Sequence, residues 1–211
     1  MGVLAIVPQS HLRAAKTRLA AVLRPDARAA LALELLGRVC AALRATPAVT
    51  ALTVVSPDPA VRAWGDRNGY AVTLDPGCGL NAALEYARRG ARDPRHDVLI
   101  IAADLPWLRA ADVTALLRAR RDTRIVLAPS KDGAGTNALA LPGCRWFTPS
   151  FGAGSRVAHR REAALRGLEL FEVARPGLAF DVDTPDDLRT LWSTVPARAT
   201  RRASGSRYNQ G

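Results

Sequence analysis

The chain has 211 residues, 48% of them hydrophobic, and a formal net charge of +11 at pH 7. It is long enough for one domain with a full core, and no apolar run reaches the roughly 18 residues that cross a membrane. The first residues, MGVLAIVPQ, lack the basic start of a signal peptide, so we expect a cytoplasmic protein that does not enter membranes. Cys40, Cys78 and Cys144 are scattered and without metal-ligand spacing, which argues against a disulfide framework or a zinc site.

The positive charge comes almost entirely from arginine, because Lys16 and Lys131 are the only lysines. With so much alanine, this composition is typical of a GC-rich genome, and much of the charge should lie on the solvated surface. The excess suits anionic ligands, either phosphorylated small molecules or nucleic acid. Residues 197–211 contain four arginines and no acidic residue, which predicts a basic, disordered tail after a domain formed by residues 1–196.

Strand-like runs alternate with amphipathic helical patterns along the chain, for example at residues 26–45 and 109–121. This alternation predicts an α/β fold, a mainly parallel sheet with helices on both faces, in one domain. The expected strands are residues 3–8, 51–56, 71–75, 97–104, 124–129, 137–142 and 168–174. Ligands in such sheets bind beyond the carboxyl ends of the strands, so the loops that follow the strands are the places to look for a site.

The first of these loops, residues 7–20, is rich in cations. Arg13, Lys16 and Arg18 lie within six residues and suit a polyphosphate, because several cations can share several phosphate oxygens. A lysine in a chain that otherwise uses arginine indicates a site that needs a compact point charge. The loop lacks the glycines of a Walker motif, and a plain basic loop remains the alternative.

The strand around Val98 to Ile101 is apolar on both faces and runs into Asp104. An unpaired carboxylate at that position would be costly to desolvate, so it needs a cation, a helix amino terminus or a ligand as its partner. We expect its charge to serve function rather than stability. Replacing it with asparagine should therefore leave the stability of the ligand-free fold unchanged or raise it.

A second group of carboxylates follows residue 180. Asp181 and Asp183 alternate on an expected short strand, so their side chains should point to opposite faces. A helix then begins near Pro185, and the helix dipole explains Asp186 and Asp187. One of the two alternating aspartates, with Asp104, could supply the two carboxylates that hold a magnesium ion on nucleotide phosphates.

Six motifs in one order carry a family resemblance: VPxxxLxxAKTRLA at 7–20, GLNAALE at 79–85, ADLP at 103–106, DGAGTNAL at 132–139, FGAGS at 151–155 and DVDTPDDL at 181–188. Together they resemble the 2-phospholactate or phosphoenolpyruvate guanylyltransferases of deazaflavin coenzyme (F-420) biosynthesis, within the MobA-like nucleotidyltransferases. The resemblance implies a Rossmann-like nucleotidyltransferase domain. It also implies transfer of GMP from GTP, with Mg²⁺, to phosphoenolpyruvate or 2-phospho-L-lactate, with release of pyrophosphate. A downstream transferase would then use the product.

The resemblance also assigns roles to residues. Lys16 and Arg18 would hold the triphosphate, with Arg13 beside them, and stabilise the leaving pyrophosphate. Asp104 would bind magnesium from one side, and Lys16, Arg18 and Asp104 would form the catalytic set. Asp183 would bind the metal from the other side.

Asp181 is the less favoured alternative to Asp183 for that second metal contact. Gly79 and Asn81 would lie at the nucleotide, where the glycine permits close backbone approach to the base and the amide offers donors. Thr136, Gly152 and Ser155 would bind the acceptor, at a helix amino terminus with free backbone donors, although Ser155 could also be a plain helix cap.

One position departs from the family pattern. Members usually carry a lysine in the first loop, in a sequence like VPVKxL, whereas this chain has VPQSHL with Gln9 and Ser10 there. One phosphate ligand could be missing, which leaves a related nucleotidyltransferase with another nucleotide or acceptor as an alternative. A basic nucleic-acid-binding module is disfavoured, since aromatic residues are 5% of the chain and no basic stripe interleaves with them. Between the acceptors we favour phosphoenolpyruvate on compositional likeness to actinobacterial members, and we leave the oligomeric state open.

Overall fold

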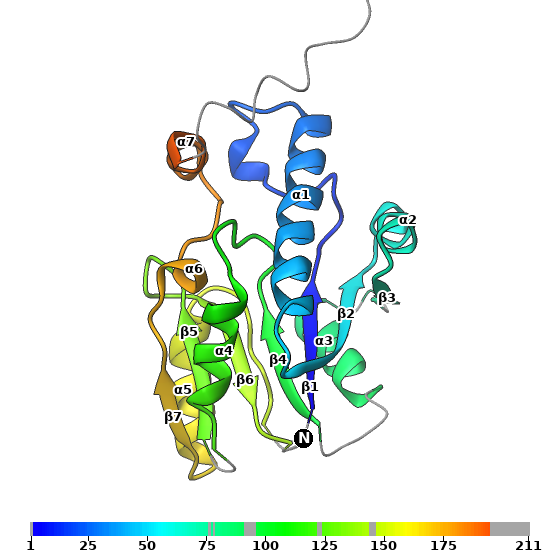
Figure 1. Ribbon diagram of the computed structural model, residues 1–211. Coiled ribbons are helices and arrows are strands. Elements are labelled where there is room, and N and C mark those ends of the chain that lie inside the picture. Colours follow the sequence, from blue (N-terminus) through cyan, green and yellow to red (C-terminus); the bar gives the residue numbers. More distant parts are fainter. Residues whose placement is uncertain are drawn as a thin grey trace, which may run out of the picture.

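The computed structural model describes most of the chain (Figure 1). The described residues are 2–75, 77, 79–90, 96–121, 124–143 and 147–194. The predicted tail, residues 197–211, lies outside them, as do Cys78 and Cys144. Cys40 is buried and free, and burial raises the pKa of its thiol to about 12, so it is an unreactive core residue.

The strands form one sheet in the order β3-β2-β1-β4-β6-β5-β7. Their bounds are Val3–Pro8 (β1), Val49–Ser56 (β2), Ala71–Leu74 (β3), Asp97–Ile101 (β4), Arg124–Pro129 (β5), Thr136–Leu141 (β6) and Glu169–Glu172 (β7). All pairs are parallel except those of β6, which runs antiparallel to both β4 and β5. The predicted mainly parallel α/β sheet is confirmed, and each strand expected from the sequence is present.

Helices cover both faces of this sheet (Figure 1). Their bounds are Pro25–Arg44 (α1), Pro59–Asn68 (α2), Leu80–Arg89 (α3), Ala110–Arg118 (α4), Ser155–Leu165 (α5), Pro176–Ala179 (α6) and Pro185–Thr194 (α7), with a 3-10 turn at Thr17–Leu19 (η1). None of the described helices is long and apolar enough to cross a membrane.

The central strand β1 explains why both faces must be covered. Val3, Ala5 and Val7 point into one core, with apolar residues of α1, α2, α4 and α6, while Leu4 and Ile6 point into another, with residues of α3 and α5. Alternate residues of a strand face opposite sides, so a run that is apolar at every position needs two cores. A third, smaller cluster packs α7 against α1 and η1.

The carboxyl ends of β1 and β4 lie side by side at the same end of the sheet, because the two strands are parallel neighbours. β4 ends at Ile101, earlier than the predicted residue 104, and the chain turns at Ala103 and Asp104. The loop after β1, the turn after β4 and the segment before α7 thus gather at the same end of the molecule (Figure 1).

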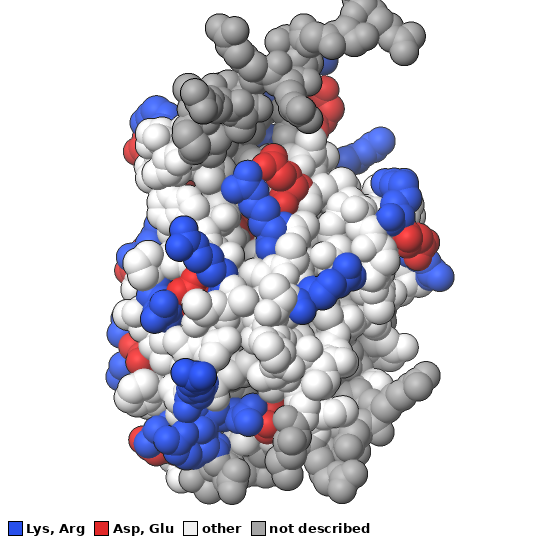
Figure 2. All heavy atoms as spheres, viewed as in Figure 1, with Lys and Arg blue, Asp and Glu red and all other residues white. Residues whose placement is uncertain are grey.

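Basic side chains form several separate groups on the face shown in Figure 2, most of them with acidic side chains beside them. The ion pairs agree with this picture, since Arg156 and Arg160 both bind Glu172, and Arg124 binds Glu169. On this face of the described residues, the positive charge is therefore divided among separate groups, many of them beside carboxylates.

Two mid-helix glycines provide a test of the packing. An added Cβ at Gly65 would lie 2.9 Å from the carbonyl oxygen of Tyr70 and would overlap the side chain of Val72, whereas one at Gly37 would make an ordinary 3.6 Å contact with Trp64. Gly37→Ala should raise the free energy of unfolding by about 0.5 to 1 kcal/mol through helix propensity. Gly65→Ala should lower it by about 1 to 3 kcal/mol through overpacking.

Urea denaturation of the two variants beside the parent protein measures both changes. Stabilisation by both substitutions would contradict the close approach of α2 to β3.

Candidate functional site

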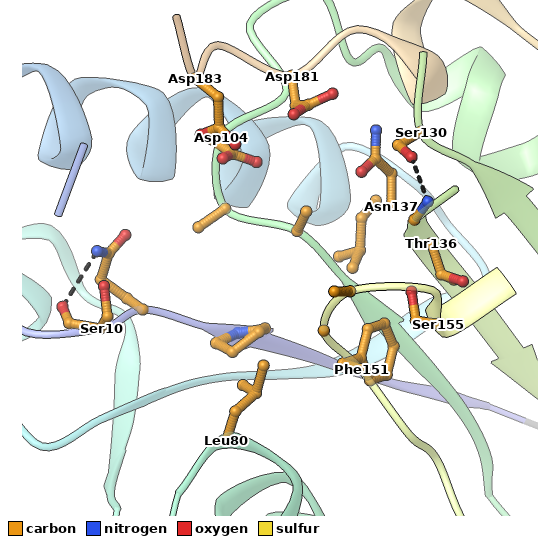
Figure 3. Close-up of a pocket in the computed structure, with 18 of the residues that line it drawn as sticks. Ser10, Leu80, Asp104, Ser130, Thr136, Asn137, Phe151, Ser155, Asp181 and Asp183 are labelled. Carbon is orange, nitrogen blue, oxygen red and sulfur yellow. Dashed lines mark hydrogen bonds between the residues drawn. The ribbon is translucent and has the colours of Figure 1, made fainter. Parts of the chain in front are cut away.

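A cavity of about 580 Å³ lies beyond the carboxyl ends of β1 and β4, a volume typical of small-molecule sites (Figure 3). It is lined by the loop after β1, the turn after β4, the β5–β6 turn, the segment before α5 and the segment before α7. Of the residues predicted from sequence, those on its wall are Lys16, Arg18, Asp104, Thr136, Gly152, Ser155, Asp181 and Asp183. The place in the sheet agrees with the general rule for open α/β folds.

Lys16 is the centre of the polar end of this cavity. Its Nζ donates to Oδ2 of Asp104 at 2.5 Å and to Oδ1 of Asp183 at 3.0 Å, and its side chain is 8% exposed. Burial disfavours the charged ammonium, but the two carboxylates outweigh that effect and raise the pKa of Lys16. Lys16 also has a left-handed backbone (φ 54°), unlike any other non-glycine residue in the described part of the chain. Such strain, on the order of 1 to 3 kcal/mol, is typical of functional sites.

The partner that Asp104 needs is thus a cation of the same chain. Asp104 shares the nearly buried ammonium of Lys16, so we now expect loss of this carboxylate to destabilise the ligand-free protein, contrary to the expectation from sequence. Arg18 lies nearby, with Nη1 3.8 Å from Oδ2 of Asp183, but its side chain is 75% exposed, and this long contact is its only ion pair with a described residue. Arg13 is exposed and is not on the cavity wall.

Asp181 and Asp183 do not alternate on a strand, which corrects the sequence prediction. Residues 181–183 have no regular secondary structure, and both carboxylates line the same cavity (Figure 3). Side chains take the backbone groups that a strand would use in a ladder: the carboxylate of Asp187 accepts from the N–H of Asp183 and of Thr184, and Lys131 donates to the carbonyl of Asp181. These bonds turn both aspartates toward one space.

Asp181 has an atom without a partner. Its Oδ1 is buried and makes no hydrogen bond in the described part of the chain. Burial raises the pKa of Asp181, and the negative charge of Asp104 raises it further. An orphaned carboxylate oxygen beside two more carboxylates suits a hard divalent cation.

The oxygen donors therefore fit Mg²⁺, although within the described residues no three acidic, histidine or cysteine side chains are close enough to hold a metal ion by themselves. An ion here would need two carboxylates together with oxygens of a bound ligand or water.

The other end of the cavity holds Thr136 and Ser155 (Figure 3). Both are buried, and the hydroxyl of Ser155 makes no hydrogen bond to described residues. Gly154, not Ser155, is the N-cap of α5, so the plain-cap alternative for Ser155 is wrong.

The expected free backbone donors of α5 are also absent, since the N–H groups of Ser155, Arg156 and Val157 donate to carbonyls of Gly152, Ala134 and Gly154. The N–H groups of Ala153 and Gly154 have no partner among the described residues. An anion at this end would thus be bound by two hydroxyls and the loop backbone, with little from the helix itself.

Asn81, predicted to lie at the nucleotide, forms hydrogen bonds with the loop before α5. Its amide nitrogen donates to the carbonyl of Phe151 at 3.1 Å, and its Oδ1 accepts from the N–H of the same residue at 2.8 Å. This pair ties the start of α3 to the loop before α5. Neither Asn81 nor Gly79 is on the cavity wall, where the neighbouring Leu80 lies instead. Gly79 has a φ of +90° and begins the helix, so its glycine is required by the backbone turn.

The departure in the first loop leaves no cation at that position. Gln9 is buried, and its side-chain amide donates to the carbonyl of Ser10. Both residues line the cavity. The wall opposite the carboxylates is therefore polar and uncharged at this point.

Sequence reasoning missed three residues. Lys131 and Asp187 form an ion pair of 2.6 Å that holds the segment before α7, and His159 is fully buried against Thr136. The rarity of lysine, which singled out Lys16, applied equally to Lys131. Nothing local to the sequence distinguishes His159 from a surface histidine, because two arginines, Arg160 and Arg161, follow it directly.

Comparisons with known proteins match this chain along most of its length. A family model described as "Guanylyl transferase CofC like" matches residues 3–195. A phosphoenolpyruvate guanylyltransferase of Sphaerobacter thermophilus is 44% identical over 207 residues, 98% of this chain and 100% of the relative. A 3-phospho-D-glycerate guanylyltransferase of Phenylobacterium zucineum is 39% identical over 178 residues, 82% of each chain. The solved structure of a nucleotidyl transferase from Methanothermobacter has a TM-score of 0.65 at 19% identity, over 91% of this chain and 97% of that one, which shows a shared fold.

Asp186 and Asp187 both lie in the first turn of α7, but only Asp187 pairs with Lys131. Comparing the two residues therefore separates the effect of the helix dipole from that of the contacts Asp187 makes. Burial opposes ionisation of Asp187, but Lys131 and the backbone donors outweigh it and lower its pKa to about 2. Against an ordinary value of 3.8, this difference corresponds to about 2 kcal/mol at neutral pH. Asp187→Asn should cost about that much. Asp186→Asn, which removes an exposed carboxylate in the same turn, should cost only about 0.5 kcal/mol.

A lowered pKa stabilises the fold above the unfolded value and ceases to do so as the pH falls through the folded value. The cost of Asp187→Asn should hence fade between about pH 4 and pH 2. Chemical denaturation at pH 7 and across that acid range measures it. Equal costs for the two variants at pH 7 would mean that the helix dipole alone explains Asp187.

Proposed function

The chain belongs to the family of CofC-like guanylyl transferases, and on this premise we propose that it transfers GMP from GTP to the phosphate of phosphoenolpyruvate, releasing pyrophosphate. The observation that carries the proposal is one cavity with two chemically different ends. Lys16, Asp104 and Asp183 meet at one end, and the hydroxyls of Thr136 and Ser155 lie at the other. A transfer between two anionic substrates needs such a pair of adjoining subsites.

The carboxylate end would take the triphosphate of GTP. Asp104 and Asp183 would hold a magnesium ion, with Asp181 in support through Oδ1, which makes no hydrogen bond to any described residue. When bound, the ion would neutralise developing charge on the phosphates. Lys16 would exchange a carboxylate contact for a phosphate oxygen, and Arg18 has an exposed guanidinium that can turn toward the leaving pyrophosphate.

The reaction itself asks little acid or base chemistry of the protein. An oxygen of the acceptor phosphate forms a bond to the α phosphorus, and the bond from that phosphorus to the oxygen bridging to the β phosphate breaks. A phosphate dianion is already a competent nucleophile at neutral pH. The side chains therefore act by positioning the two anions in line and by stabilising charge on the departing pyrophosphate.

The hydroxyl end would hold the acceptor by its carboxylate. Thr136 and Ser155 supply donors, and the N–H groups of Ala153 and Gly154, which have no partner in the described part of the chain, add two more. Phosphoenolpyruvate is proposed because the 44% identical relative carries that activity. 2-Phospho-L-lactate, and the 3-phospho-D-glycerate of another relative, share the carboxylate and phosphate, so a pocket of this kind separates them by modest factors.

The proposed product is a mixed diphosphate of GMP and enolpyruvate. Such a compound is labile, so we infer that a transferase of F-420 biosynthesis takes it directly. GTP and phosphoenolpyruvate are both metabolites of the cytoplasm, which places the proposed reaction there. GTP is proposed as the nucleotide because the family is described as guanylyl transferases. The alternative is a related nucleotidyltransferase that uses another nucleotide.

A pyrophosphate-release assay tests the substrates. With GTP and Mg²⁺, phosphoenolpyruvate should be turned over with a higher kcat/KM than 2-phospho-L-lactate or 3-phospho-D-glycerate, and ATP or CTP should replace GTP poorly. Preference for another phospho-acid would transfer the proposal to that acceptor. Turnover with CTP in place of GTP would contradict the guanylyl assignment.

Substitution of the carboxylates tests the metal site. Asp104→Asn and Asp183→Asn should each lower kcat at saturating Mg²⁺ by about 10² or more, because one of two metal ligands is lost. Asp104→Asn should also lower the free energy of unfolding, since Lys16 then keeps one carboxylate partner. Asp186→Asn serves as the control, because it removes an exposed carboxylate outside the cavity. Normal turnover by Asp104→Asn would exclude the two-carboxylate site.

A further inference from the structure

His159 lies on α5, fully buried beneath the acceptor end of the cavity. Its ring has a hydrogen-bond partner at each nitrogen: Nδ1 is 3.0 Å from the hydroxyl of Thr136, and Nε2 is 2.9 Å from the backbone nitrogen of Ser150. Its edges pack near the rings of Phe147 and Phe151. The ring is thus held at both nitrogens and has two aromatic neighbours.

The backbone partner fixes the protonation of this ring. A backbone N–H can only donate, so Nε2 must accept from Ser150 and carries no proton. Burial lowers the pKa of His159 to about 4, so the ring is neutral at pH 7. In a neutral imidazole the single proton is then on Nδ1.

This tautomer determines what the hydroxyl of Thr136 can do. The Nδ1–H donates to Thr136 Oγ1, so the oxygen of that hydroxyl is used as an acceptor. The hydroxyl proton is left to point elsewhere, because this side chain has no hydrogen-bond partner other than His159 among the described residues. Thr136 is on the cavity wall, and the hydroxyl proton is the one donor that its side chain has left for a ligand.

We propose that His159 is a positioning residue that makes the hydroxyl of Thr136 an obligatory donor toward the acceptor substrate. A fixed donor matches a group that only accepts hydrogen bonds, such as an ionised carboxylate. It would select acceptors that present a carboxylate at this end and disfavour their amides or esters. The inference deepens the proposed function and rests on the acceptor being bound at Thr136.

The same ring also anchors the loop before α5, through Ser150, and a purely structural role would rest on that bond. The two bonds are made by different nitrogens, so they can be removed separately. In His159→Asn the shorter amide reaches the position of Nδ1 and keeps a donor for Thr136, but loses Nε2. In His159→Gln the longer amide reaches the position of Nε2 and keeps an acceptor for Ser150, but loses Nδ1.

The tautomer can be measured without any activity. The chain has three histidines, so long-range ¹H–¹⁵N correlation spectra of histidine-labelled protein are simple, and the signals lost in His159→Gln identify this ring. At pH 7 we expect the neutral form with the proton on Nδ1. A proton on Nε2, or a doubly protonated ring, would overturn the proposal, because Thr136 would then be placed differently.

Steady-state kinetics with phosphoenolpyruvate and GTP give the functional test. His159→Gln should raise the KM for phosphoenolpyruvate roughly three- to tenfold, and His159→Asn should stay within about twofold of the parent, with the KM for GTP unchanged in both. In a Thr136→Val background the difference between the two variants should vanish. A larger effect of His159→Asn, or equal effects, would assign His159 to the loop and overturn the proposal. Failure of the parent protein to use any phospho-acid would instead refute the proposed function, and the spectra would still decide the tautomer.

Discussion

The interaction on which the site depends is the ammonium of Lys16 shared between Asp104 and Asp183. These residues come from three segments that are far apart in sequence, and the ion pairs fix the loop after β1, the turn after β4 and the segment before α7 around one space. The left-handed backbone of Lys16 is the local cost of aiming its side chain there. A nearly buried ammonium is tolerable only because both carboxylates compensate its lost hydration. Removing any one of the three charges would leave the remaining charges without full compensation.

The same arrangement explains how three carboxylates can line one cavity in the ligand-free protein. Asp104, Asp181 and Asp183 face one cavity, and their mutual repulsion is held in check by Lys16 at the centre and by Lys131 behind the segment. In the proposed reaction a magnesium ion and a triphosphate would enter together, so that the ion takes over the carboxylates while the phosphates take over the lysine. The net change in local charge is then small, which suits a site that must bind and release anions repeatedly. At the hydroxyl end, in contrast, selectivity in the proposed reaction would come from donors held in fixed directions.

The fold could be predicted well because its signals are local. Val98 to Ile101 is apolar at every position, and only a strand covered on both faces explains that pattern. The sequence indicates that Asp104 needs a partner, but that partner, Lys16, lies 88 residues away in the chain, so local patterns could not identify it. Asp181 and Asp183 were assigned to opposite faces because alternation assumes a strand, and bonds from Asp187 and Lys131 override that geometry. His159 and the satisfied N–H groups of α5 were equally beyond reach, since both depend on which loops meet after folding.

The most direct test of this account is the binding of Mn²⁺, as a paramagnetic substitute for Mg²⁺, followed by electron paramagnetic resonance with and without GTP. Since Lys16 occupies the carboxylates in the ligand-free protein, the account predicts weak binding of the metal alone and at least tenfold tighter binding once GTP is present, a coupling of about 1.4 kcal/mol. Lys16→Met should strengthen binding of the metal alone, because it removes the competing cation. Tight binding of Mn²⁺ without nucleotide, or an affinity for the metal that GTP does not change, would contradict the central role given to Lys16 and its two carboxylates.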